Sequence, residues 1–106
     1  MIRHISIFTF LDVPEKQQNI ETVRACLGRM PELYPPMKNA VVAVPAAPAE
    51  PLPDDAPVMQ GDLIQIADYD TLDDANAYAP SKAHMDLVAL STPMLKKVTV
   101  IDYMLP

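Results

Sequence analysis

Glycine, cysteine and tryptophan are scarce in this sequence, and each shortage excludes a class of site. Two of the 106 residues are glycine, one is cysteine and none is tryptophan. Because Gly28 and Gly61 stand far apart, the chain has no glycine-rich loop of the kind that holds nucleotide phosphates. A single cysteine also excludes an internal disulfide bond and a cysteine-rich zinc site.

Long hydrophobic runs are missing as well. No apolar stretch approaches the about 20 residues that a transmembrane helix needs, and the first residues do not follow the pattern of a signal peptide. We therefore expect a soluble, cytoplasmic protein without a membrane partner.

Positive charge is the third shortage. Lysine and arginine number 8 against 14 aspartates and glutamates, which gives a formal net charge of -6. Nucleic-acid binding needs clustered basic side chains, so no nucleic-acid partner is expected. The two histidines, His4 and His84, lack a neighbouring glutamate or cysteine at ligand spacing, and such isolated histidines make a poor metal site. We expect neither a metal nor another cofactor.

Proline, by contrast, is abundant. Five of the twelve prolines fall within residues 45–57, where they prevent a regular hydrogen-bonded element. We predict an extended loop at residues 45–60 inside a single domain that spans residues 1–106. The loop is either a surface connector or a lid or partner-contacting arm, because long loops in compact domains are often functional.

The remaining segments alternate between strand and helix patterns. Runs rich in β-branched residues predict strands at 3–11, 38–44, 63–69 and 98–104. Apolar residues at helical spacing and capping residues predict helices from about Pro14 to Met30, from Thr71 to Tyr78 and from Lys82 to Leu90, with Pro31 stopping the first. This order predicts an α+β, ferredoxin-like βαββαβ protomer, in which a four-stranded antiparallel sheet carries its helices on one face.

The first strand is apolar on both faces. His4, Ser6, Phe8 and Phe10 share one face, and Ile5, Ile7, Thr9 and Leu11 share the other. Since helices cover only one face of such a sheet, the other would expose an apolar patch too large for a monomer. We therefore expect a homodimer with two facing sheets and a ligand-sized space between them. The face with His4 is assigned to this interior.

Three segments together resemble the stress-responsive α/β-barrel (Dabb) family. They are RHISIFTF from Arg3, YAPSKAHMDL from Tyr78 and VTVIDYM from Val98, and they span nearly the whole chain in the family's order and spacing. The resemblance implies a homodimeric α/β barrel with a ferredoxin-like protomer. The family includes plant stress proteins, unassigned bacterial proteins and olivetolic acid cyclase, a polyketide cyclase that performs an aldol-type ring closure.

The resemblance to that cyclase also implies a pair of site residues. Its working tyrosine and the histidine six residues later match Tyr78 and His84, and the family's early strand histidine matches His4. The chain departs from the cyclase at two other histidines. Ser81 begins a Ser-Lys-Ala-His segment in place of His-Pro-Ala-His, and Leu63 occupies the position of a further pocket histidine.

Local chemistry suits this pair. His84 would lie in the first turn of a helix capped by Ser81, where free amide groups disfavour a charged imidazole and favour the neutral form that a general base requires. Tyr78 ends the preceding helix, and the break at Pro80 could bring its phenol into the same pocket as a donor to a carbonyl or enolate oxygen. Alternatively, Tyr78 packs at a helix end and His84 is a hydrogen-bonded structural residue.

Three functions remain open on these grounds. The first is a cofactor-independent cyclase or aldol-type enzyme acting on a polyketide-like or other poly-carbonyl intermediate. The second is a non-catalytic, stress-related or pathway-accessory dimer that binds a small apolar molecule, and the third is a cofactor-free monooxygenase. For the first function we predict that His84 and Tyr78 are catalytic, in a pocket lined by His4, Ser6, Phe8, Phe10 and Leu63.

Overall fold

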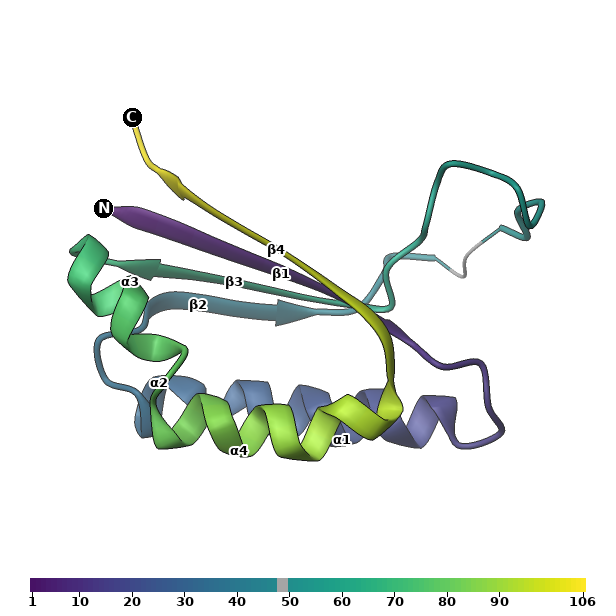
Figure 1. The fold of residues 1–106 in the computed structure, drawn as a ribbon, viewed down its shortest axis with the longest axis horizontal. Coiled ribbons are helices and arrows are strands. Elements are labelled where there is room, and N and C mark those ends of the chain that lie inside the picture. The colour runs from purple at the N-terminus through teal and green to yellow at the C-terminus, as the bar shows by residue number, and fades with distance from the viewer. Residues whose placement is uncertain (48–49) are drawn as a thin grey trace.

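The computed structural model describes residues 1–47 and 50–106, and its elements follow the βαββαβ order. They are β1 (Ile2–Phe10), α1 (Lys16–Gly28), α2 (Met30–Leu33), β2 (Lys38–Ala43), β3 (Leu63–Tyr69), α3 (Leu72–Tyr78), α4 (Lys82–Ser91), the 3-10 turn η1 (Thr92–Met94) and β4 (Leu95–Met104). The strands form one antiparallel sheet in the order β2-β3-β1-β4. All helices lie on one side of it (Figure 1), which confirms the ferredoxin-like prediction.

Several element boundaries differ from the prediction, and the structure explains two of these differences. Strand β4 begins at Leu95 rather than Val98, because Leu95 pairs with Phe10 beyond an irregularity in β1. Helix α1 ends at Gly28, and Pro31 lies in the first turn of α2 instead of stopping a helix. Proline is compatible with that place because the first amide groups of a helix have no carbonyl partner.

The segment from α3 to α4 is organised by the two predicted caps. The Thr71 hydroxyl accepts a hydrogen bond from the Asp74 amide at 3.1 Å. The Ser81 hydroxyl accepts one from the His84 amide at 3.3 Å and donates one to the Tyr78 carbonyl at 2.6 Å. Ser81 thus ties the end of α3 to the start of α4 and fixes the spacing between Tyr78 and His84.

The hydrophobic core lies between the sheet and the helices. It includes Phe8 and Phe10 from β1 and Val23 and Leu27 from α1, all 4% exposed or less. Even-numbered residues of β1 therefore face the helices, as the alternation of a strand requires. The described part of the 45–60 loop contains no helix or strand, whereas Pro48 and Ala49 lie outside the described residues. Among the described helices, none has the length and hydrophobicity to cross a membrane.

The opposite face of the sheet carries no helix and is mostly aliphatic. Ile5 of β1 lies opposite Ile66 on β3 and Ile101 on β4, and Ile7 lies opposite Ile64. Ile101 is 56% exposed in the single chain. We call this surface, made by Ile5, Ile7, Ile64, Ile66 and Ile101, the open face.

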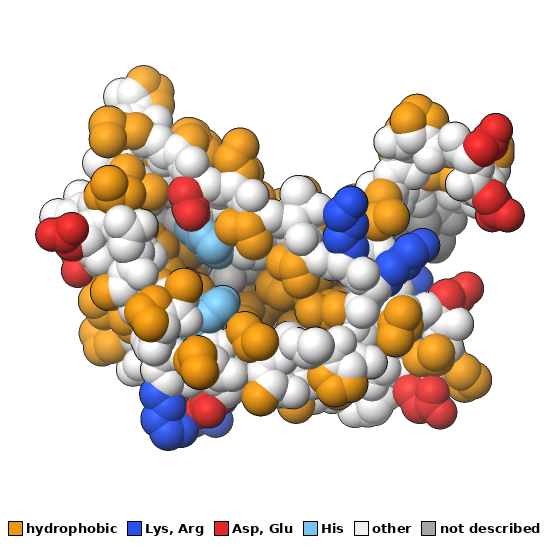
Figure 2. Space-filling view, in the orientation of Figure 1, with side chains coloured by type: hydrophobic (Ala, Val, Ile, Leu, Met, Phe, Trp, Pro, Cys, Tyr) orange, Lys and Arg blue, Asp and Glu red, His pale blue; other side chains and the backbone are white. Residues whose placement is uncertain are grey.

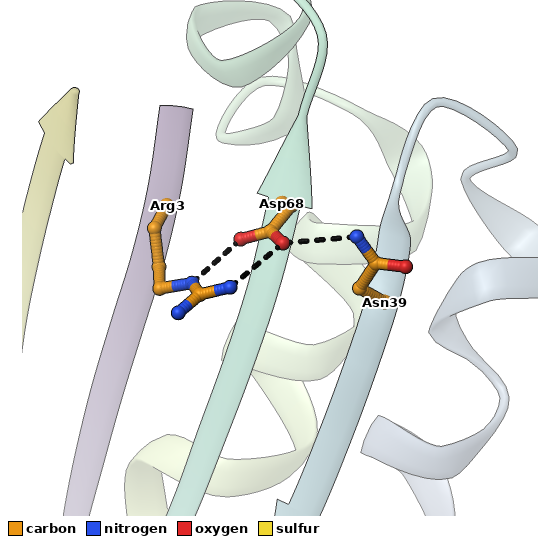
Figure 3. Close-up of polar contacts among 3 residues, drawn as sticks. All are labelled: Arg3, Asn39 and Asp68. Atoms are coloured by element: carbon orange, nitrogen blue, oxygen red, sulfur yellow. Dashed lines mark hydrogen bonds and ion pairs between the residues drawn. The ribbon is translucent and has the colours of Figure 1, made fainter. Parts of the chain in front are cut away.

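One polar cluster lies on this side of the sheet (Figure 3). Arg3 donates through Nε and Nη2 to the two Asp68 carboxylate oxygens at 2.8 and 3.0 Å, and Asn39 donates to Asp68 Oδ2 at 3.0 Å. Asp68 is 1% exposed, and its hydrogen bond with Arg3 lowers the pKa of its carboxyl group. Asn39 has a φ of 50° at a bulge in β2, a conformation that asparagine tolerates better than most residues. The cluster is therefore an internally satisfied tie across three strands.

Candidate functional site

A cavity of about 240 Å³ lies between α4 and the β1–β4 half of the sheet. Its mouth is visible as a hollow with both histidines at its edge (Figure 2). The walls are mostly apolar and come from Phe8, Leu87, Val88, Leu95, Val98 and Val100. Polar groups enter from His4, Ser6, Gln65, Tyr78, His84, Ser91 and Thr92. An apolar cleft with a few convergent polar groups is the usual form of a small-molecule site.

The position of this cavity corrects the expectation from sequence. We expected a space between the sheets of two protomers, but the cavity lies on the helix-covered face within one protomer. The reason is geometric. Tyr78 and His84 belong to α3 and α4, which lie on one side of the sheet, so only strand residues that face that side can share a pocket with them.

The predicted lining residues separate into two groups. His4, Ser6 and Phe8 line the cavity together with Tyr78 and His84. Phe10 and Leu63 do not line it, because both are buried in the core, each 2% exposed. The structure adds Gln65 of β3, which the sequence analysis did not single out although its alternation with Leu63 and Ala67 placed it on the same face.

The hydrogen bond of His84 determines which ring nitrogen is available. Its Nδ1 lies 2.9 Å from the carbonyl oxygen of Ala79. A carbonyl can only accept, so in the neutral ring Nδ1 carries the proton and Nε2 is left with a lone pair. This assignment follows from the contact, and it makes Nε2 the atom that can accept a proton from a ligand.

Tyr78 places an unpaired hydroxyl group in the same region. The residue is 4% exposed, and its hydroxyl has no hydrogen-bond partner within residues 1–47 and 50–106. Its ring meets that of His84 edge to face, with centroids 4.7 Å apart. Burial raises the pKa of Tyr78 to about 12, and Cys26 adds to this rise. The nearby Gln65 side chain acts to lower the pKa, although its position relative to the Tyr78 hydroxyl does not meet the geometry of a hydrogen bond. The phenol is therefore protonated near neutral pH and can donate.

A second set of polar groups runs along the cavity from β4 to β1. Asp102 lies opposite His4 in the strand register, and its Oδ1 is 2.6 Å from His4 Nδ1. The other ring nitrogen, His4 Nε2, is 2.7 Å from the hydroxyl oxygen of Ser6. Asp102 could not be identified from the sequence, since only the pairing of the first and last strands brings it to His4.

The described residues contain no evident metal site. Within the described ranges, no group of three or more histidine, cysteine, aspartate or glutamate side chains could hold a metal ion. Cys26 of α1 packs against the core, and burial raises the pKa of its thiol, which disfavours the reactive thiolate.

Solved structures share this fold. A dimeric ferredoxin-like protein of unknown function from Bacteroides fragilis is 20% identical, with a TM-score of 0.79 over 96% of this chain and 93% of that one. A dimeric ferredoxin-like protein of unknown function from Thermobifida fusca is 26% identical, with a TM-score of 0.75 over 98% and 90%. The hydroxynitrile lyase of Passiflora edulis is 17% identical, with a TM-score of 0.79 over 99% and 93%.

Curated protein sequences give no match to this chain. The family comparison is decisive, because the match covers almost every residue and agrees with the observed sheet order. The stress-responsive A/B barrel (Dabb) domain matches residues 2–105, and the chain belongs to this family.

Proposed function

We propose that this protein is a cofactor-independent enzyme that removes a proton from a carbon atom next to a carbonyl group. His84 Nε2 is the base, and the Tyr78 hydroxyl donates a hydrogen bond to the oxygen that becomes negative. The observation that carries the proposal is the buried Tyr78 hydroxyl, which has no partner in the described part of the chain and belongs to a ring that contacts the His84 ring edge to face.

The energetics of the Tyr78 hydroxyl support a role with a ligand. A buried donor without a partner costs about 1–3 kcal/mol, so folding alone favours phenylalanine at this position. A bound carbonyl oxygen would remove that cost, and it would gain more as it becomes an enolate. The proton transfer to His84 would contribute about 10²–10⁴-fold in rate, the range typical of general base catalysis.

The volume and the walls of the cavity limit the size and polarity of the substrate. About 240 Å³ is small for an organic ligand, and the walls are mostly aliphatic and aromatic. We infer a small apolar ketone or ester, or one end of a poly-carbonyl chain of the polyketide type. In a poly-carbonyl molecule the enolate carbon could attack a second carbonyl and close a ring, which is the aldol-type reaction implied by the matching Tyr78 and His84 positions.

The hydroxynitrile lyase of Passiflora edulis shows that this fold can serve an enzyme. At 17% identity the likeness concerns the fold alone, so the reaction here is argued from the site. A non-catalytic ligand-binding protein is the second candidate, which the apolar walls favour. The enzyme and the ligand-binding protein differ in their response to substitution of His84, which would lower turnover in the first and only ligand affinity in the second.

We further propose that the chain forms a homodimer through the open face. Its isoleucines form an aliphatic surface that the chain's own helices do not cover, and a sheet-sized apolar surface is uncommon on a monomer. Two of the similar structures are described as dimeric, which agrees with this arrangement. The cavity lies on the other side of the sheet, so each protomer would keep its own site.

The test is deuterium exchange at the acidic carbon of a small β-keto ester, followed by NMR in heavy water. The wild-type protein should accelerate exchange over buffer, and His84→Ala should lower the enzymatic rate about 100-fold or more. Met85→Ala is the matched control, because Met85 occupies the same helical turn, is 60% exposed and lies outside the cavity lining. Unchanged exchange in a folded His84→Ala protein would refute the base role.

A further inference from the structure

Asp102, His4 and Ser6 form a continuous hydrogen-bonded line that the proton-abstraction mechanism does not use. The line runs from Asp102 Oδ1 to His4 Nδ1 at 2.6 Å and from His4 Nε2 to Ser6 Oγ at 2.7 Å. His4 and Ser6 are neighbours on the same face of β1, and Asp102 faces His4 from β4. Three residue types are thus joined in the order carboxylate, imidazole, hydroxyl.

The direction of the hydrogen bonds follows from the chemistry of the groups. A carboxylate can only accept, so the Asp102 side chain holds the His4 proton on Nδ1. In the neutral ring His4 Nε2 is then an acceptor, and the Ser6 hydroxyl donates to it. This arrangement draws the proton away from Ser6 Oγ, and a histidine oriented in this way is the usual activator of a serine nucleophile.

The surroundings of Ser6 suit acyl chemistry. Ser6 is 4% exposed and lines the cavity beside the apolar side chains of Phe8, Val98 and Val100. The Tyr78 ring lies edge to face with His4, with centroids 6.0 Å apart, so its unpaired phenol belongs to the same site. A nucleophile, an oriented base and a buried proton donor therefore share one apolar cavity.

We propose that Ser6 is a nucleophile that takes an acyl group from a small ester with a short apolar acyl chain. Ser6 Oγ attacks the ester carbonyl carbon, and its proton passes to His4 Nε2. The carbon–oxygen bond to the alcohol then breaks, and the alcohol leaves with the proton from His4. A water molecule, deprotonated by His4, attacks the acyl-serine, which releases the carboxylic acid and restores Ser6.

This reaction needs no oxidant, reductant or metal, and it does not depend on His84. Asp102 acts as a positioning residue, since it contacts His4 rather than substrate. Its side chain is 50% exposed, whereas that of His4 is 12% exposed. Water therefore screens the Asp102–His4 contact, and loss of the carboxylate should weaken the reaction less than loss of His4.

The test is covalent labelling of the full chain with an alkyl fluorophosphonate, followed by mass spectrometry of the labelled peptide. We expect one label, on Ser6, and no label in Ser6→Ala. Labelling should slow about 100-fold or more in His4→Ala. It should slow by a smaller factor in Asp102→Asn, because Asp102 positions His4 and does not itself take the proton.

Asp86→Asn is the matched control for Asp102→Asn, because Asp86 is an exposed aspartate on α4 that pairs with Lys82 and does not line the cavity. It should label at the wild-type rate. A folded wild-type protein that takes no label on Ser6, or that labels equally fast in His4→Ala, would overturn the proposal.

Failure here is distinguishable from failure of the proposed function. His84→Ala should abolish the deuterium exchange of a β-keto ester while leaving the Ser6 label in place. Ser6→Ala should lose the label, and replacing His84 in the Ser6→Ala protein should still lower the exchange rate. Hydrolysis of p-nitrophenyl acetate gives a second readout, with an initial release of p-nitrophenol that Ser6→Ala lacks.

Discussion

The two faces of the sheet are built from the same strands but differ in whether their buried polar groups have hydrogen-bond partners. On the open face, Asp68 is buried and fully engaged by Arg3 and Asn39. On the helix-covered face, Tyr78 is equally buried, yet its hydroxyl has no partner in the described part of the chain. A satisfied buried group stabilises the fold, whereas an unsatisfied one is free to bind a ligand. The two faces therefore differ in that one holds a satisfied polar cluster and the other holds an unpaired hydroxyl beside the cavity.

The largest expected effect is the dissociation of the proposed dimer when the open face is altered. Ile101→Lys introduces a charge on the open face, and a buried unpaired charge in a dimer interface is strongly unfavourable. Because Ile101 is 56% exposed on an edge strand, the single chain should still fold. We expect the dimer to dissociate, as measured by light scattering. Met104→Lys, on the opposite side of β4 and 72% exposed, should leave the dimer intact.

A smaller effect, on the free energy of unfolding, is expected when the polar cluster around Asp68 is disrupted. Asp68→Asn removes the charge that Arg3 and Asn39 bind, and it should lower the free energy of unfolding by about 1–3 kcal/mol at neutral pH. Chemical denaturation measures this loss. Asp70→Asn is the control, because Asp70 is exposed and forms only a surface pair with Lys38. Equal stability of Asp68→Asn and wild type would show that the cluster is not a stabilising tie.

The same cluster predicts a pH dependence. Arg3 holds the pKa of Asp68 below its ordinary value in the folded state, so the folded protein binds this proton less readily than the unfolded chain. The stabilisation is complete above the unfolded value of about 4 and is lost as the pH falls further. Wild type and Asp68→Asn should therefore converge in stability in acid. A constant difference between them down to pH 2 would contradict this account.

The smallest effect is expected at Tyr78. Tyr78→Phe removes a hydroxyl that has no partner in the described part of the chain, so the free energy of unfolding should rise by about 1 kcal/mol, the lower end of the cost of an unpaired buried donor. The same variant should slow deuterium exchange of a β-keto ester, because the enolate oxygen loses its donor. A marked loss of stability would mean that the hydroxyl has a structural partner and would remove the contrast with Asp68.

Much of the scaffold follows from local sequence signals. The caps at Thr71 and Ser81 depend on residues three positions away, and both hydrogen bonds are present in the structure. Strand β3 has the predicted bounds because apolar residues recur throughout the segment from Leu63 to Tyr69. The predicted start of β4 was wrong, since Lys96 and Lys97 interrupt the run of apolar residues. This part of the strand is defined only by its pairing with β1. Local patterns cannot report a partner that lies far along the chain.

The sequence by itself determined the order of the elements, the capped break between α3 and α4 and the nearness of Tyr78 to His84, because hydrogen bonds within a few residues encode them. Only the tertiary structure decided which face of the sheet holds the cavity. It also decided that Asp102 meets His4 across 98 residues. Both depend on strand register and helix packing, which are set by the burial of the whole apolar surface rather than by any one segment.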